Sequence, residues 1–233
     1  MYQETKTLSN TFVANVFTWM FAALGLTALT AYFFGTSESL FQLLYTINAK
    51  GYATLSGLGW IVTLAPFIIV LIMSFGTNKL NAQQTISLFV LYAVLMGMSL
   101  SSIFIVYTGT SIVKTFIITA GMFGVMAIMG YTTKTDLTKL GSILLMALFG
   151  MIIAILVNMF TQSARLEYII SIVGVIIFTG LTAYDVQKIK EIGQTGVNDG
   201  EVMTKVTIFA ALSLYLDFLN LFLYLLRFFG KRD

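Results

Sequence analysis

The chain has 233 residues, of which 58% are hydrophobic and only 10% are charged, and its mean hydropathy is +0.92. This composition excludes an ordinary soluble domain, and the small net charge of +3 gives no indication of a nucleic-acid partner. The absence of Cys excludes disulfides and thiolate chemistry, and the absence of His removes the usual side chain for sensing neutral pH.

Long apolar segments separated by short polar gaps recur along the chain. This is the pattern of membrane-spanning helices and not of alternating barrel strands. We therefore predict an all-α integral membrane protein with a single transmembrane domain, residues 1–233. Its seven helices are expected at about residues 11–35, 54–76, 85–107, 112–131, 141–160, 166–189 and 206–229.

The first ten residues are polar and lack the basic start of a secretory signal, so we predict a cytoplasmic tail before the first helix. The stretch 40–45 is apolar but too short to span, and is expected at the membrane interface. Small residues four positions apart predict close helix contacts in the third and fourth helices. These pairs are Gly97 with Ser101 and Ala120 with Gly124.

Positive residues in the polar gaps predict the orientation of the chain. With the N-terminus inside the cell, the outer gaps hold only Lys50, Lys114 and Arg165, and the remaining basic residues before the last helix fall on the inner side. This asymmetry favours a cytoplasmic N-terminus. The basic residues after the last helix fit the rule less well, since a full span would place them outside.

The last predicted helix carries a polar face in an otherwise apolar segment. Its polar residues follow at helical spacing: Ser213, Asp217, Asn220, Tyr224 and Arg227. A carboxylate in the middle of a bilayer costs about 2.5 to 3.5 kcal/mol on insertion scales, so Asp217 should face the protein interior and bind a proton or a cation. Asp217 is therefore the first candidate for a functional residue.

The preceding helix ends with a second acid, Asp185, between Tyr184 and Lys188, and a polar loop is expected at 191–205. Because consecutive helices are antiparallel neighbours, both acids point to the same half of the membrane. They can meet only if the last helix starts in a recess, tilts, or is broken near Ser213, since Asp217 lies deeper than Asp185 should.

Two carboxylates a few ångströms apart cannot both ionise cheaply, so such a pair would share one proton. Without the proton, the two carboxylates would repel each other and attract a divalent cation, because hard oxygen ligands suit Ca²⁺. A proton-gated cation path follows as a hypothesis, with Asp185 and Asp217 as sensor and calcium ligands. The alternative is that each Asp only joins two helices by hydrogen bonds and never titrates in the working range.

Four segments of the sequence resemble the Bax inhibitor family, also called transmembrane Bax inhibitor motif proteins, and its bacterial branch in particular. They are residues 97–102, 107–109, 179–189 and 211–222, and the similarity extends from the first helix to the last. The resemblance implies seven helices with the C-terminal helix central, a bacterial inner membrane, and a pH-sensitive calcium leak. It also implies a di-aspartyl pH sensor, at the positions of Asp185 and Asp217.

One departure from the family pattern concerns a basic latch. Members with a described latch have an arginine in the second helix that pairs with the acid of the sixth, but residues 54–76 hold no basic side chain. Either Lys79, Lys188 or Lys190 would take that part, or gating would rest on the acids alone. We expect Ser213, Asn220, Tyr184 and Lys188 to support the acid pair.

Two other functions compete with the leak. Paired acids on neighbouring helices are also found in intramembrane aspartyl proteases, but the bulky residues 214–216 before Asp217 and the lack of a Pro-Ala-Leu motif disfavour an enzyme. The second is an interaction protein that restrains a protease or a death-regulating partner in the membrane. The lipid bilayer and calcium ions are the other expected partners, and no cofactor is expected.

Overall fold

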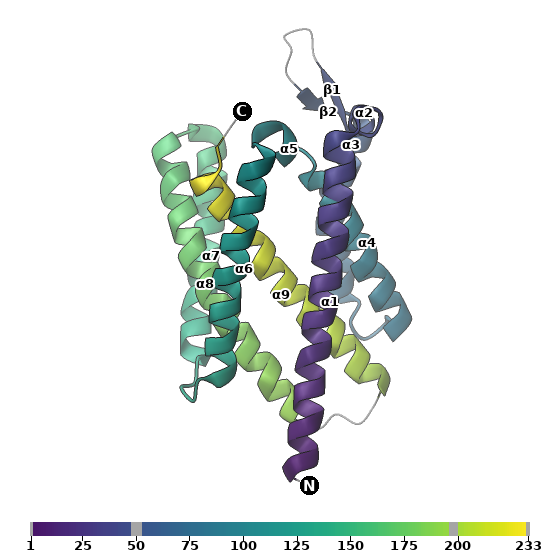
Figure 1. Ribbon diagram of the computed structural model, residues 1–233, viewed down its shortest axis with the longest axis vertical. Helices are drawn as coiled ribbons and strands as arrows, with labels where there is room; N and C mark the ends of the chain where they lie inside the picture. Colours follow the sequence, from purple (N-terminus) through teal and green to yellow (C-terminus); the bar gives the residue numbers. More distant parts are fainter. Residues whose placement is uncertain (1, 48–52, 196–199, 232–233) are drawn as a thin grey trace. The chain divides into compact units, whose positions relative to one another are not determined.

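The structure is a computed structural model that describes residues 2–47, 53–195 and 200–231. Along this part of the chain, the elements follow in the order shown in Figure 1. They are α1 (Tyr2–Thr36), α2 (Glu38–Leu44), β1 (Tyr45–Ile47), β2 (Ala53–Leu55), α3 (Gly57–Phe75), α4 (Ala82–Leu100), α5 (Ile103–Val106), α6 (Gly109–Thr132), α7 (Thr138–Thr161), α8 (Ala164–Gln194) and α9 (Gly200–Phe229).

Seven helical segments among the described residues are long and apolar enough to cross a membrane, with α4 and α5 forming one of them. The prediction of seven spanning helices is confirmed. In the most apolar window of α9, 61% of the residues are buried, against 50% or less in the other six. The expectation that the C-terminal helix is the innermost one is therefore also confirmed, and this position keeps its polar residues away from lipid.

The helix bounds differ from the predicted ones mainly at polar ends. The expected tail is helical, because α1 begins at Tyr2. The expected loop at 191–205 is wrong at both ends, since α8 continues to Gln194 and α9 begins at Gly200. Glu, Lys and Gln are good helix formers, so these helices continue beyond their apolar stretches. Residues 196–199 of that loop, and Lys50, lie outside the described residues.

The chain divides into two compact units. The first comprises residues 1–14, 108–196 and 213–232, and the second comprises residues 15–107, 197–212 and 233, each as far as it is described. Helices α1 and α9 contribute to both. The predicted single domain stays a prediction.

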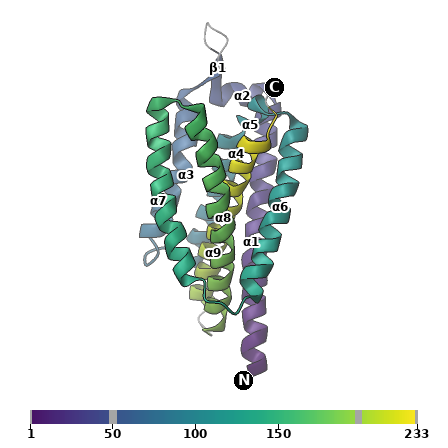
Figure 2. The same cartoon turned by 90° about the vertical axis from the view of Figure 1, so that its left-hand side faces the viewer.

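In the first unit, α8 lies between α6 and α7 (Figure 2). The contact with α6 is very close, because a Cβ added to Gly130 would lie 2.2 Å from the carbonyl oxygen of Ala183. The contact with α7 is similar, with the ring of Tyr184 packed over Gly141. In contrast, nothing lies within 4 Å of a Cβ built on Gly124, so the close contact predicted there is wrong. The buried side of α6 at this level is formed by Phe123, which is 2% exposed, and not by Gly124.

The turn between α7 and α8 is fixed by side chains. Gln162 adopts a left-handed conformation with φ of 47° and ends α7. Asn158 Oδ1 accepts a hydrogen bond from the backbone N–H of Ser163 at 3.0 Å. The Ser163 hydroxyl in turn accepts from Leu166 N and caps α8. This tight turn places α7 antiparallel to α8 over its length.

In the second unit, α4 contacts both α1 and α3. The close contact predicted at Gly97 is present, since an added Cβ would lie 2.5 Å from the carbonyl oxygen of Thr27. The Thr27 hydroxyl donates to Ala93 O at 2.9 Å, and the Ser99 hydroxyl donates to Val62 O on α3 at 3.0 Å. Polar side chains thus join the helices where small residues let them approach.

The apolar stretch 40–45 forms most of the short helix α2 and the first residue of β1. Strands β1 and β2 pair in antiparallel fashion, with Tyr45 opposite Leu55 and Thr46 opposite Thr54. This small hairpin was not predicted, because strands of three residues carry no readable alternation. It is an addition to a fold that is otherwise helical.

Candidate functional site

The structure brings together the two acids that the sequence selects. The carboxyl groups of Asp185 on α8 and Asp217 on α9 lie within hydrogen-bonding reach of each other. The hydroxyl of Ser213, one turn before Asp217, donates to Asp185 Oδ2. All three residues belong to the same compact unit.

The acids meet where α8 and α9 line the same cavity, although Asp217 lies farther inside α9 than Asp185 lies inside α8. Helix α8 continues past Asp185 to Gln194, so this acid does not lie at the end of its helix. Helix α9 is unbroken through Ser213. Of the three arrangements that would let the acids meet, a break near Ser213 is therefore wrong, and a recess or a tilt stays a prediction.

Asp217 is the more deeply buried acid. Its side chain is only 6% exposed, and no residue in the described part of the chain donates a hydrogen bond to its Oδ2. Two ionised carboxylates can only accept hydrogen bonds. A proton on either acid would let it donate to the other, so the geometry suits a pair that shares one proton.

The acid pair lines a cavity of about 530 Å³ between α7, α8 and α9. All of its charged or titratable lining residues come from α8 and α9, namely Tyr184, Asp185, Lys188, Asp217 and Tyr224. Its lining from α7 is entirely apolar and consists of Leu145, Leu148, Met151, Ile152 and Ile155. The cavity therefore has a hydrocarbon wall on α7, and opposite it an acidic wall on α8 and α9 that also includes Phe178, Leu181 and Leu216.

The supporting residues predicted from the sequence all line this cavity. Lys188 is exposed, and its Nζ lies 6.0 Å from the centroid of the Tyr184 ring. Asn220 Nδ2 donates to Leu216 O of its own helix at 2.8 Å. The Tyr224 ring stacks on Phe178 at 5.8 Å. Of the predicted polar face of α9, only Arg227 is not part of the cavity lining.

The donor set is small for a metal centre. No group of three or more His, Cys, Asp or Glu side chains able to hold a metal ion was found over the described stretches. Calcium takes roughly six to eight oxygen ligands in a tight site. Two carboxylates and a serine hydroxyl fit a weakly held, exchanging cation better than a resident one.

Two residues close to Asp185 bind the α6–α7 region: Gln187, which was not singled out from the sequence, and Lys190, which was named only as a possible replacement for the basic latch. Gln187 is 7% exposed; its Nε2 donates to Thr135 O, and its Oε1 accepts from Leu137 N, both at 2.8 Å. Lys190 Nζ donates to Tyr131 O at 2.7 Å. Together they fasten the α6–α7 connection to α8. The signal for them was the run of polar residues after Asp185 in an otherwise buried helix end.

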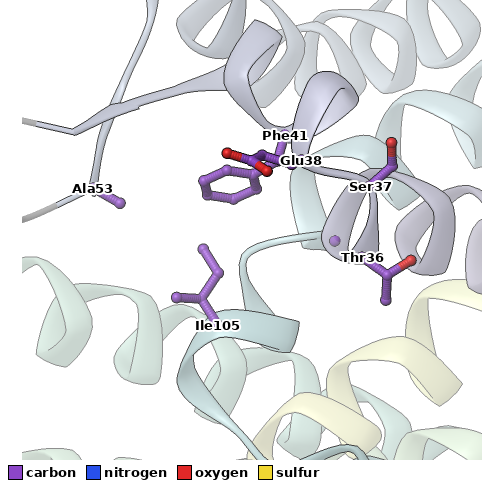
Figure 3. A pocket seen from close by; sticks show the side chains of 7 residues that line it. Thr36, Ser37, Glu38, Phe41, Ala53 and Ile105 are labelled. Atoms are coloured by element: carbon purple, nitrogen blue, oxygen red, sulfur yellow. The ribbon is translucent and has the colours of Figure 1, made fainter.

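A second cavity, of about 360 Å³, lies in the other unit and is lined by the end of α1, by α2, β2 and α5. Figure 3 shows the Glu38 carboxylate beside the Phe41 ring, with Ile105 across the opening. Glu38 Oε1 accepts from Gln42 Nε2 at 3.2 Å. A single exposed and partnered acid offers no counterpart to the buried pair, so the cavity at Asp185 and Asp217 is the stronger candidate site.

Comparison with known proteins agrees with the motifs around these acids. Residues 9–233 match the family described as "Inhibitor of apoptosis-promoting Bax1". The chain belongs to the Bax inhibitor family. This confirms the resemblance that the sequence motifs indicate, and it makes the protein a multi-pass membrane protein of that family.

Bacterial members of the family are similar over nearly the whole chain. The Escherichia coli K12 protein named "Inner membrane protein YbhL" is 47% identical over 223 residues, which cover 95% of this chain and 92% of the relative. A Borreliella burgdorferi protein is 46% identical over 225 residues, with 97% and 94% covered. A Rickettsia prowazekii protein is 41% identical over 244 residues, with 100% and 99% covered.

Proposed function

We propose that this protein is a pH-sensitive leak channel for calcium, gated by protonation of the pair Asp185 and Asp217. The observation that carries the proposal is the contact between these two carboxyl groups at the wall of a cavity, with one oxygen of Asp217 lacking a donor among the described residues. The printed name of the Escherichia coli relative supports a bacterial inner membrane as its location. The N-terminus is proposed to lie in the cytoplasm, as the distribution of positive charges favours.

The protonated pair is the closed state in this proposal. With one proton between them, Asp185 and Asp217 form a hydrogen bond that joins α8 to α9 and carries one negative charge instead of two. The Ser213 hydroxyl adds a second link between the same helices through Asp185. These bonds hold the acidic wall together and leave little negative charge to attract a divalent cation.

Loss of the proton leaves two like charges in contact. Their repulsion favours separation of α8 from α9, and together they attract a divalent cation. The small donor set suits permeation, because a conducting site must bind an ion strongly enough to admit it and weakly enough to release it. The apolar α7 wall offers the ion no ligands, so the polar residues of α8 and α9, the two acids above all, must bind it.

Lys188 is the basic residue in the cavity lining. Because α3 has no basic residue, an arginine latch from that helix cannot act here. We propose that Lys188 partly balances the charge of the acids from the mouth of the cavity. Its exposure limits this effect, since exposed charge pairs contribute little.

Calcium entry into liposomes that contain only this protein and a fluorescent calcium indicator tests the proposal. We expect the entry rate to change between about pH 6 and 8, and Asp185→Asn and Asp217→Asn each to remove this dependence by removing the shared proton. Asp136→Asn is the matched control, since Asp136 is an exposed acid in the α6–α7 connection. Unchanged pH profiles in both cavity variants would refute the sensor.

The same two variants, together with an inhibitor, separate the competing functions. An interaction protein that restrains a membrane partner would keep its function in both variants and lose it through changes on outward-facing helix surfaces. For the protease, a transition-state analogue of aspartyl proteases should bind. The fully buried Leu214 and Tyr215, directly before Leu216 and Asp217, leave little room for a substrate backbone there, which disfavours that function.

A further inference from the structure

The cavity at the acid pair has the two-sided chemistry of an amphiphile site. Its acidic wall carries Asp185 and Asp217, and its apolar wall is one face of α7, with Leu148, Met151 and Ile152 at its middle. Its volume of about 530 Å³ falls within the roughly 300–1,000 Å³ of small-molecule pockets. An inorganic ion would contact only the acidic wall and would leave the hydrocarbon wall unused.

The apolar wall is open along its side. Leu145 is 41% exposed and Ile152 is 44% exposed, although both line the cavity, whereas Met151 between them is 5% exposed. These residues lie in the middle of α7, which is long and apolar enough to span the membrane from Thr138 to Thr161. The cavity is therefore a groove that a molecule dissolved in the bilayer can enter from the side.

The acidic wall favours a cationic head group. Asp217 is 6% exposed, lines the groove, and has an oxygen that receives no hydrogen bond from the residues the structure describes. The acids outnumber the basic residue of the lining, Lys188, which is exposed and lies over the Tyr184 ring. An ammonium group supplies both a positive charge and N–H donors. A hydroxyl supplies only a donor, and a carboxylate or sulfate would be repelled.

We propose that this groove binds a single-chain alkylammonium amphiphile. Its ammonium group contacts Asp217 and Asp185, and its alkyl chain lies along the α7 face of Leu148, Met151 and Ile152. The α7 lining residues Leu148, Met151, Ile152 and Ile155 follow one another at helical spacing and form a single row, which suits one alkyl chain. The inference rests on the proposed function in one respect, since both use the same acids, and it adds that such an amphiphile would compete with calcium for them.

The test uses the full chain in phosphatidylcholine nanodiscs and a dodecylamine that carries a photoreactive diazirine at the end of its chain. Labelled residues are mapped by mass spectrometry, with the matching dodecanol and dodecanoate probes as comparisons. We expect the amine to label α7 between residues 145 and 155 and the two other probes to label outward-facing residues without preference. Asp217→Asn should reduce this labelling roughly tenfold, because a hydrogen bond to a charged group contributes about that factor to binding.

Ile152→Trp is the second variant, because its larger side chain narrows the groove from the α7 side and leaves both acids unsubstituted. It should also abolish the labelling. Its matched control is Ile153→Trp on the same helix, since Ile153 is 63% exposed and is not a lining residue. The control should label like the natural protein. Amine labelling that is spread evenly over outward-facing residues, or that is equal in Ile152→Trp and Ile153→Trp, would overturn the proposal.

Calcium entry in the absence of any amphiphile distinguishes this inference from the proposed function. A pH-dependent leak combined with unspecific labelling would refute the amphiphile site and would leave the proposed channel function intact. Specific labelling in a protein without a leak would support the site and would show that the acids serve a ligand and not a channel.

Discussion

Ser213 on α9 donates a hydrogen bond to Asp185 on α8, and this bond joins the two helices at the acid pair. Asp217 follows Ser213 by one helical turn, so both residues lie on the same face of α9. Asp185 therefore contacts this face at two points, the Ser213 hydroxyl and the Asp217 carboxyl group. A change in the charge of either acid therefore changes the strength of the contact between α8 and α9. This arrangement makes it possible to separate the charge of Asp185 from its role in packing.

Two substitutions of Asp185 make that separation. Asp185→Asn keeps an acceptor for Ser213 but has no charge, so we expect a melting temperature in detergent close to that of the natural protein and no pH dependence of calcium entry. Asp185→Leu leaves the Ser213 hydroxyl and Asp217 without this partner, which costs about 1 to 3 kcal/mol per buried polar group, and should lower the melting temperature. If Asp185 only joined helices, Asp185→Asn would keep the natural pH profile.

Lys188→Gln should increase calcium entry at the pH where the acids are ionised. The substitution removes a positive charge from the cavity lining, and that charge repels an approaching divalent cation. The expected increase is two- to fivefold, because an exposed charge at this range contributes about 1 kcal/mol or less. Initial rates at low and high ionic strength measure it, and the difference should shrink at high salt.

The control for Lys188→Gln is Lys139→Gln. Lys139 is also exposed, lies in the first turn of α7, and does not line the cavity. Equal rates in both variants would show that Lys188 does not act on the ion.

The sequence predicted the spanning helices and the acid pair because both depend on patterns along the chain. Long apolar stretches predict the helices, and an acid inside an apolar helix needs a partner, which selects Asp217. Asp185, predicted near the end of the preceding helix, is the candidate partner because consecutive helices are antiparallel neighbours. The apolar wall of the cavity could not be predicted in this way. Ile152 and Ile153 are adjacent and chemically identical, yet only Ile152 lines the cavity.

The glycine positions show the same limit of prediction from sequence. Gly124 and Gly130 lie on one helix, and the sequence pattern pointed to Gly124, which has nothing near it. Gly130, which was not selected, is the one that contacts a neighbouring backbone. A small residue permits close packing, but only the position of the neighbouring helix decides whether it is used.

Gly130→Ala should destabilise the protein, because the new methyl group would overlap the backbone of Ala183, and a backbone atom cannot move away as a flexible side chain can. Overpacking of this kind costs about 1 to 3 kcal/mol. Gly124→Ala is the matched control on the same helix and should be neutral or stabilising by up to about 1 kcal/mol, because Ala is the better helix former. Melting temperatures in one detergent measure both, and equal destabilisation would contradict the close contact of α6 with α8.

Gln187→Leu should loosen the connection between α6 and α7. The substitution removes both side-chain hydrogen bonds to this connection, at Thr135 O and Leu137 N, and each contributes about 0.5 to 1.5 kcal/mol. We expect trypsin to cleave after Lys134 and Lys139 roughly tenfold faster, since cleavage requires local opening. Gln194→Leu on the exposed end of α8 is the control. Equal cleavage rates in the two variants would show that Gln187 does not hold the connection.

Asp136 gives a prediction of pH dependence outside the membrane-spanning segments. Hydrogen bonds from the side chain and the backbone of Thr138 lower the pKa of its carboxyl group, and the backbone N–H of Thr138 donates to Oδ1 at 2.8 Å. Since the folded state has the lower pKa, the stabilisation is complete above the unfolded pKa of about 3.9. It is lost as the pH falls through the folded value.

Asp136→Asn keeps an oxygen acceptor for Thr138 but cannot titrate. We therefore expect the natural protein to lose more stability than this variant when the pH is lowered from about 5 to about 3, the range that contains the carboxyl pKa. The difference should be small, because the carboxylate is exposed and solvent screens it. Melting temperatures of both proteins across this range measure it. A constant difference at every pH would mean that the contact with Thr138 does not distinguish the charged from the neutral carboxyl group.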